Sequence, residues 1–146
     1  MLEYTINPVQ MGGLVKEVTP EGVKIHLHGR LGVLTVPHSL VLAPDPEPGL
    51  ELRFWFSYLR VREKPYDYDA APLRSPGESF PTLVGAGLTE VNDTAILARI
   101  QDNLGTVAVP RRWVFTDVPL AVGQTAEFYL SPMEAVGKRE IPASFI

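Results

Sequence analysis

The chain has 146 residues and no cysteine, which excludes disulfides, thiolate metal sites and cysteine nucleophiles. A hydrophobic fraction of 45% is typical of a globular protein and excludes a disordered one. The formal net charge of −4 provides no general attraction to nucleic acid or to an anionic membrane.

The sequence resembles itself after a shift of 73 residues. This shift places Leu31–Pro37 on Leu104–Pro110, and a shift of 74 places Ser57 on Ser131 and Gly13-Leu14 on Gly87-Leu88. A repeat of this kind indicates two similar units joined in tandem. Units of about 50 residues have marginal cores on their own. We therefore expect the units to pack on each other, and we expect function to depend on residues that differ between them.

The first unit, residues 1–61, has the pattern of a short β meander. An opening strand near Gly13–Val18 is followed by a turn signal, and apolar and polar residues then alternate along Val23–His28. This period of two indicates a half-buried strand. A third strand ends at Pro37, which has no N–H for the ladder. A proline-rich loop then leads to one long last strand, Leu50–Val61.

Residues 62–84 contain four prolines, so they are predicted to be a semi-stiff, extended connector. The second unit, residues 85–146, repeats the plan of the first, with Ile96–Gln101 alternating and Thr125–Leu130 as its last strand. The tail, residues 141–146, is apolar up to its end, and we expect it to dock on this chain or on a neighbour.

Neither unit shows a sustained 3.6-residue period. The sequence therefore predicts an all-β protein made of two tandem small five-stranded β-barrels, OB-like or SH3-like, packed as a pseudo-symmetric pair. The first residues lack the pattern of a signal peptide, and no apolar run is long enough to span a membrane. We expect a cytoplasmic protein without a membrane partner.

Two resemblances accompany this pattern. The first unit is similar to the strand layout of S1-type OB barrels, which usually bind single-stranded nucleic acid, at Gly13–Val18, Gly22–Leu27, Gly32–Val36 and Pro48–Leu52. It also resembles a group of small uncharacterised proteins of clostridia and related anaerobes that carry one such unit, at Asn7–Val15, Gly29–Pro37 and Phe54–Tyr58. The second unit matches only in part, since Asn103 replaces Arg30. Neither resemblance implies a catalytic activity.

Candidate catalytic and metal-binding residues are few. His26 and His28 lie two residues apart on one predicted strand face, a spacing that can chelate zinc if His38 or a carboxylate supplies a third ligand. The alternation favours ordinary solvent-facing positions for them. Paired carboxylates such as Asp67 and Asp69 lie in proline-rich loops, and no phosphate-binding or dinucleotide motif occurs. We predict no enzyme activity and no cofactor.

Arginine and aromatic residues mark the predicted interaction surface. Both faces of Leu50–Val61 carry bulky side chains, which favours burial against the core on one side and a neighbour on the other. We predict a non-catalytic module that mediates protein–protein association or self-association. The interface candidates are Trp55, Tyr58, Arg60, Arg111, Arg112, Trp113, Phe145 and Ile146.

Two alternative functions stay open. The first is an OB-type single-strand binder, because bases stack on exposed rings and phosphates pair with arginine, although the net charge opposes it. The second is a binder of an oxyanion or metabolite held between the two units by backbone and hydroxyl donors. The candidate donors for it are Arg30, Thr35, Ser39 and Thr106.

Overall fold

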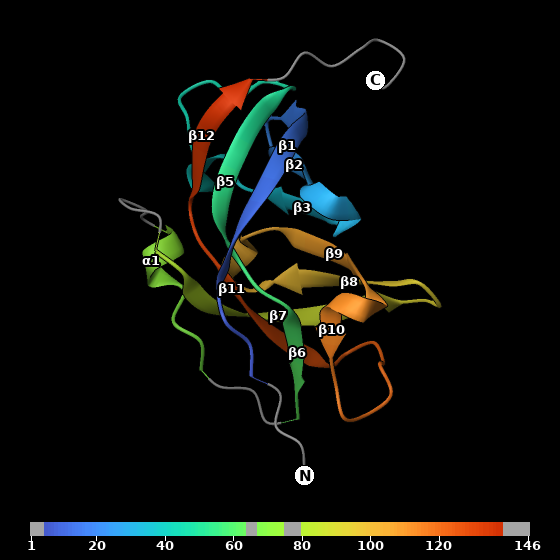
Figure 1. Cartoon of the computed structure of the whole chain (residues 1–146). Coiled ribbons are helices and arrows are strands. Elements are labelled where there is room, and N and C mark those ends of the chain that lie inside the picture. The colour runs from blue at the N-terminus through green and yellow to red at the C-terminus, as the bar shows by residue number, and fades with distance from the viewer. Residues whose placement is uncertain (1–4, 64–66, 75–79, 139–146) are drawn as a thin grey trace.

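The computed structural model describes residues 5–63, 67–74 and 80–138, and it is an all-β protein with one 12-stranded sheet (Figure 1). The strands are β1 (Val9–Thr19), β2 (Gly22–Leu27), β3 (Val33–Val36), β4 (Val41–Leu42), β5 (Leu50–Phe56), β6 (Leu59–Arg62), β7 (Thr82–Val91), β8 (Ala95–Ile100), β9 (Thr106–Pro110), β10 (Val114–Phe115), β11 (Thr125–Leu130) and β12 (Met133–Lys138). The short helices are η1 (His28–Arg30), η2 (His38–Leu40), α1 (Ala71–Arg74), η3 (Gln101–Asn103) and η4 (Arg111–Trp113). In the described part of the chain, no helix has the length and apolar character needed to cross a membrane.

The sheet consists of two groups of six strands with the same internal order. The first group is β3-β2-β1-β5-β12-β4 and the second is β9-β8-β7-β11-β6-β10. Each group therefore contains one strand from the other half of the chain: β6 pairs with β10 and β11, and β12 pairs with β4 and β5. Figure 1 shows red β12 beside β5 and green β6 beside β10. We call β6 and β12 the crossing strands.

The two groups meet in a symmetric way. Strands β3 and β9 pair antiparallel with Leu34 opposite Val107, and β5 meets β11 with Phe56 opposite Leu130. The shifts of 73 and 74 residues equate the two members of each pair. An antiparallel pair in which a residue faces its own counterpart has a local two-fold axis at that point, so both junctions follow the same pseudo-symmetry.

Two buried serines lie where the chain leaves one group for the other. The Trp55 N–H donates to Ser131 Oγ and the Tyr129 N–H donates to Ser57 Oγ, both at 2.8 Å. The serine hydroxyls donate in turn to the carbonyls of Tyr58 and Pro132, both at 2.9 Å. Since both serines are fully buried, these bonds satisfy backbone groups that have no ladder partner at the crossing.

One hydrophobic core extends through both groups. Alternating residues of β2, β5, β8 and β11 supply fully buried side chains, and Phe56 of the first half contacts Phe128 of the second edge to face, with ring centroids 5.6 Å apart. This continuity fits the expectation that units of about 50 residues need each other to bury an adequate core.

The structure corrects the prediction of one long strand over Leu50–Val61. The segment forms two strands, β5 and β6, which belong to different groups. The break at Ser57 and Tyr58 resets the alternation, so that Leu59 is buried while Tyr58 is 37% exposed. The bulky residues on both predicted faces thus reflect a change of partner.

Three further details differ from the sequence prediction. Strand β12 was not predicted, so each group has six strands where five were expected. The predicted connector contains α1 and the start of β7. The cross-strand partners of Leu14 and Gly87, His26 and Arg99, are equivalent. Leu14 therefore corresponds to Gly87, and the match of Gly13-Leu14 with Gly87-Leu88 was wrong by one residue.

Replacing Gly105 with alanine tests the junction of β3 and β9. A Cβ at Gly105 would lie 1.7 Å from the Thr35 carbonyl oxygen, at a φ of 102°. We expect Gly105→Ala to lower the free energy of unfolding by roughly 3 kcal/mol or more, measured by urea denaturation, because backbone must move. Gly123→Ala, at a φ of 96° with nothing within 4 Å, is the control and should cost about 1 kcal/mol. Equal losses would contradict the junction geometry.

Candidate functional site

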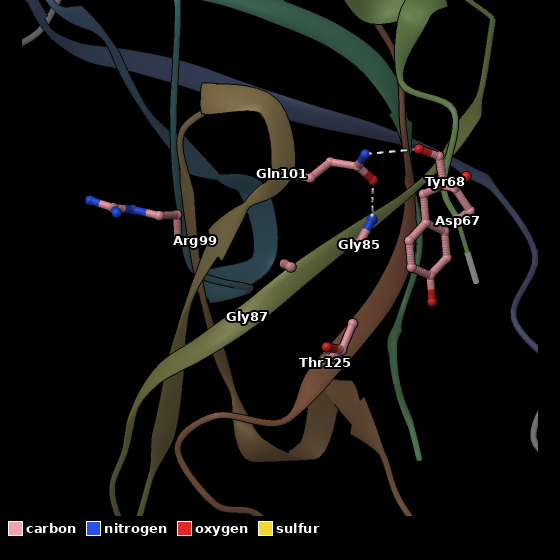
Figure 2. A pocket seen from close by; sticks show the side chains of 8 residues that line it. Asp67, Tyr68, Gly85, Gly87, Arg99, Gln101 and Thr125 are labelled. Atoms are coloured by element: carbon pink, nitrogen blue, oxygen red, sulfur yellow. Dashed lines mark hydrogen bonds between the residues drawn. The ribbon is translucent and has the colours of Figure 1, made fainter. Parts of the chain in front are cut away.

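Two adjoining hollows lie where the segment from Asp67 to Ala71 passes beside β7. Their volumes are about 320 and 520 Å³, and Asp67, Tyr68 and Gln101 line both. Figure 2 shows the first of them, with Gly85 and Gly87 of β7 along one side and Tyr68 at one end. We refer to the two together as the β7 hollow.

Gln101 fixes the segment that borders the hollow. Its Oε1 accepts a hydrogen bond from the Gly85 N–H at 2.7 Å, and its Nε2 donates to the Tyr68 carbonyl at 3.0 Å (Figure 2). The Tyr68 ring packs directly on Gly85, since a Cβ there would lie 2.6 Å from Tyr68 Cδ2. Glycine at position 85 is thus required by the close approach of the ring.

Gly87 makes the floor of the hollow open. It lies opposite Arg99 of β8 and Thr125 of β11, and a Cβ built on it would meet no atom within 4 Å. In the first group the corresponding residue is Leu14, between His26 and Glu51. A leucine side chain takes the place that is open in the second group.

The other walls also differ between the groups. His28, which corresponds to Gln101, lies over Gly12, where a Cβ would be 2.4 Å from His28 Nδ1. The first group has no counterpart of Tyr68 and Asp67 among its own strands, because these residues come from the segment that joins the two halves. The β7 hollow is therefore specific to the second group.

The rim of the hollow is acidic. The lining includes the exposed carboxylates of Asp67, Asp69 and Asp102. Among the described residues that line it, Arg99 is the one cation, and Figure 2 shows its guanidinium directed away from Tyr68. Such a site favours a cationic group. Within the described ranges, no three His, Cys, Asp or Glu side chains are grouped so that they could hold a metal ion.

The predicted interface aromatics Tyr58 and Trp113 contact each other. Their rings stack with centroids 3.7 Å apart, and Phe115 also stacks on Tyr58 at 4.6 Å. The Trp113 Nε1–H donates to the Ser57 carbonyl at 3.0 Å. These rings connect β6, which comes from the first half, to η4 and β10 of the second half, so they form part of an internal interface.

Arg60 belongs to the same internal interface. Its Nη2 lies 2.8 Å and its Nε 3.0 Å from Oε1 of Glu127, a carboxylate with no exposed surface. Arg62 Nε lies 3.3 Å from the same oxygen. An exposed counterpart occurs in the first group, where Arg53 Nη2 lies 3.4 Å from Glu134 Oε2. Both ion pairs join a crossing strand to its host group.

The remaining interface candidates do not form one patch with these. The Arg111 Nη1–H donates to the Asn92 carbonyl at 2.8 Å, and Arg112 Nη2 reaches the Arg30 carbonyl at 3.5 Å. Trp55 is half-buried opposite Gln10 on β1. Phe145 and Ile146, with the predicted docking of the tail, lie outside the described residues.

The three histidines are held in separate places. His38 Nε2 lies 2.6 Å from the Thr19 carbonyl, the position that Arg111 occupies beside Asn92 in the second half. His28 packs on Gly12. Burial lowers the pKa of His26, and the nearby charges of Lys16 and Lys24 lower it further. The structure does not bring the predicted chelating set together.

The candidate donors for a ligand between the units are also dispersed. Thr35 and Thr106 lie opposite each other where β3 meets β9. Ser39 lies in η2, and Arg30 ends η1 with a positive φ of 57°. Among the described residues, no hollow includes any of these four. Sequence reasoning missed the β7 hollow because the one-residue error in matching the units concealed the contrast between Leu14 and Gly87.

No protein-family model matches the chain, and no curated protein is found to be similar to it.

Removing the buried carboxylate of Glu127 should be far more costly than removing its exposed counterpart. Glu127→Ala leaves Arg60 and Arg62 partly buried without their counter-charge, and we expect a loss of roughly 3 kcal/mol in the free energy of unfolding. Glu134→Ala breaks a pair whose side chains are 52% and 46% exposed, so it should cost less than about 1 kcal/mol. Denaturant titration of both variants measures the difference. Similar losses would show that Glu127 is not the constraint we describe.

Proposed function

We propose that the chain is a non-catalytic binding module that associates with a protein partner through the β7 hollow. The observation that carries this proposal is the contrast at one strand position, where Gly87 leaves an open floor and Leu14 closes the corresponding place. The hollow is also rimmed by Asp67, Asp69 and Asp102. A lysine or arginine side chain of the partner is the complementary group.

The chemistry of the lining supports a long cationic side chain. The carboxylates of Asp67 and Asp102 can pair with its charged end, and the Tyr68 ring beside Gly85 can contact its apolar stem. Since these carboxylates are exposed, the attraction should weaken as the salt concentration rises. A negative net charge of −4 also favours a basic partner during encounter.

We also propose that each six-strand group is a small barrel with an OB-like strand layout, completed by a crossing strand. The parallel pairing of β12 with β4 and of β6 with β10 supports a Greek-key return, since a simple meander has antiparallel neighbours only. We place such a cysteine-free protein in the cytoplasm.

The nucleic-acid alternative has less support from the same contacts. Two rings stack on Tyr58, and Arg60 and Arg62 are paired with a buried carboxylate. These groups are already used within the chain, whereas single-strand binders present them to bases and phosphates. Fluorescence anisotropy with short oligonucleotides at low salt checks this alternative. Tight, steeply salt-dependent binding would favour it over a protein partner.

Filling the hollow should abolish association with the partner. Gly87→Leu copies the first group, and the open space at position 87 allows the larger side chain. We expect that variant and Asp67→Asn/Asp102→Asn to lose proteins that the tagged wild-type chain captures from its source cells, measured by quantitative mass spectrometry.

The control removes two exposed acids elsewhere, Glu21→Gln/Asp45→Asn, with the same change in net charge, and it should retain the partner. Capture that persists in Gly87→Leu, or that is lost equally in the control, would contradict the proposal. A small amine retained in the native mass spectrum, displaced by Gly87→Leu with no protein captured, would assign the hollow to a metabolite.

A further inference from the structure

We propose that charges of opposite sign at equivalent positions decide which group each crossing strand joins. The inference concerns the strands β5, β6, β11 and β12 and is independent of the β7 hollow. It makes the two halves unlike partners: β6 is selected by the second group, and β12 is selected by the first.

The two ion pairs occupy the same place in the two groups. On β11, Glu127 lies opposite Arg60 of β6, and on β5, Arg53 lies opposite Glu134 of β12. The shift of 74 residues equates Arg53 with Glu127 and Arg60 with Glu134. Host strand and crossing strand have therefore both reversed their charge between the halves, and attraction is preserved only when each strand crosses.

An arrangement without crossing is compatible with the chain connections. Only Ser57 and Tyr58 separate β5 from β6, and only Ser131 and Pro132 separate β11 from β12. Two residues are enough for a β-hairpin, so β6 could fold back on β5, and β12 on β11. Leu59 and Met133, the first residues of the crossing strands, are both fully buried, so apolar burial does not distinguish the two arrangements.

Charge does distinguish them. In the register that the structure shows, folding back would place Arg60 opposite Arg53 and Glu134 opposite Glu127. Like charges directly opposite each other destabilise an antiparallel pair. The second contact is the more severe, because Glu127 is fully buried and would lose Arg60 while it gained a second carboxylate.

The aromatic contacts make the same selection. Tyr58 stacks on Trp113 and Phe115 of the second group, while the corresponding residues of the first group are Leu40 and Leu42. The residue that corresponds to Tyr58 is Pro132. A β6 that folded back would lose both ring contacts, and Pro132 would meet the two rings instead.

Engineered cysteine pairs can report which host strand β12 occupies. Lys138 lies opposite Leu50 on β5, and folding back would place it opposite Gln124 on β11. Because the chain has no cysteine of its own, Leu50→Cys/Lys138→Cys reports the crossed arrangement and Gln124→Cys/Lys138→Cys reports the other. Disulfide formation under mild oxidation is quantified by mass spectrometry of the full chain. The first pair should form and the second should not.

The charge variant Arg60→Glu/Glu134→Arg reverses both crossing strands and leaves both host strands unchanged. It makes both crossed contacts repulsive and both folded-back contacts attractive. We expect the ratio of 124–138 to 50–138 disulfide to rise at least roughly tenfold over the unmodified background. An unchanged ratio would overturn the proposal.

A second variant keeps the proposal testable if the first does not fold. Arg53→Glu/Glu134→Arg changes only exposed side chains and preserves attraction in the crossed arrangement, while it removes both repulsions from the folded-back one. Its disulfide ratio should lie between those of the unmodified chain and the first variant. A ratio equal to that of the unmodified chain would show that charge does not select the partner and would also overturn the proposal.

Discussion

The structure depends on the exchange of one strand in each direction between the two halves. The edges of β5 and β11 carry backbone N–H and C=O groups that need partners, and an open edge of this kind is a liability in a β protein. The strand that covers each edge comes from the other half, and Ser57 and Ser131 satisfy the amides at the crossing. Neither half is therefore a complete sheet by itself, and the shared core follows from this.

The scaffold is symmetric, but its side chains are not. His38 and Arg111 bind carbonyls at corresponding positions, which shows that unrelated side chains can meet one structural need. Other differences have no such common purpose. Gly87 in place of Leu14 opens a hollow, and Glu127 in place of Arg53 reverses an ion pair. Differences of the second kind are the ones that bear on binding and on partner choice.

Local features of the fold could be predicted from the sequence, whereas the partners of the strands could not. Alternation identified β2 and β8, and Pro37 ends its strand as expected. Periodicity reports that Leu59 and Met133 are buried, but it is silent on which group buries them. The hollow was missed for a related reason, because Tyr68 reaches Gly85 through a connector whose path no periodicity describes.

A buried ion pair is weak evidence for stability, since desolvation offsets most of the attraction, and its better-supported role is to specify one arrangement. The two pairs here differ in this respect. Arg53 and Glu134 are about half exposed, so water and salt screen an error at that site, while Glu127 is fully buried. The two choices are coupled, however, because a β6 that occupied the first group would displace β12 toward the second. The stringent site at Glu127 therefore governs the placement of both crossing strands, and one buried carboxylate suffices where two would cost more stability.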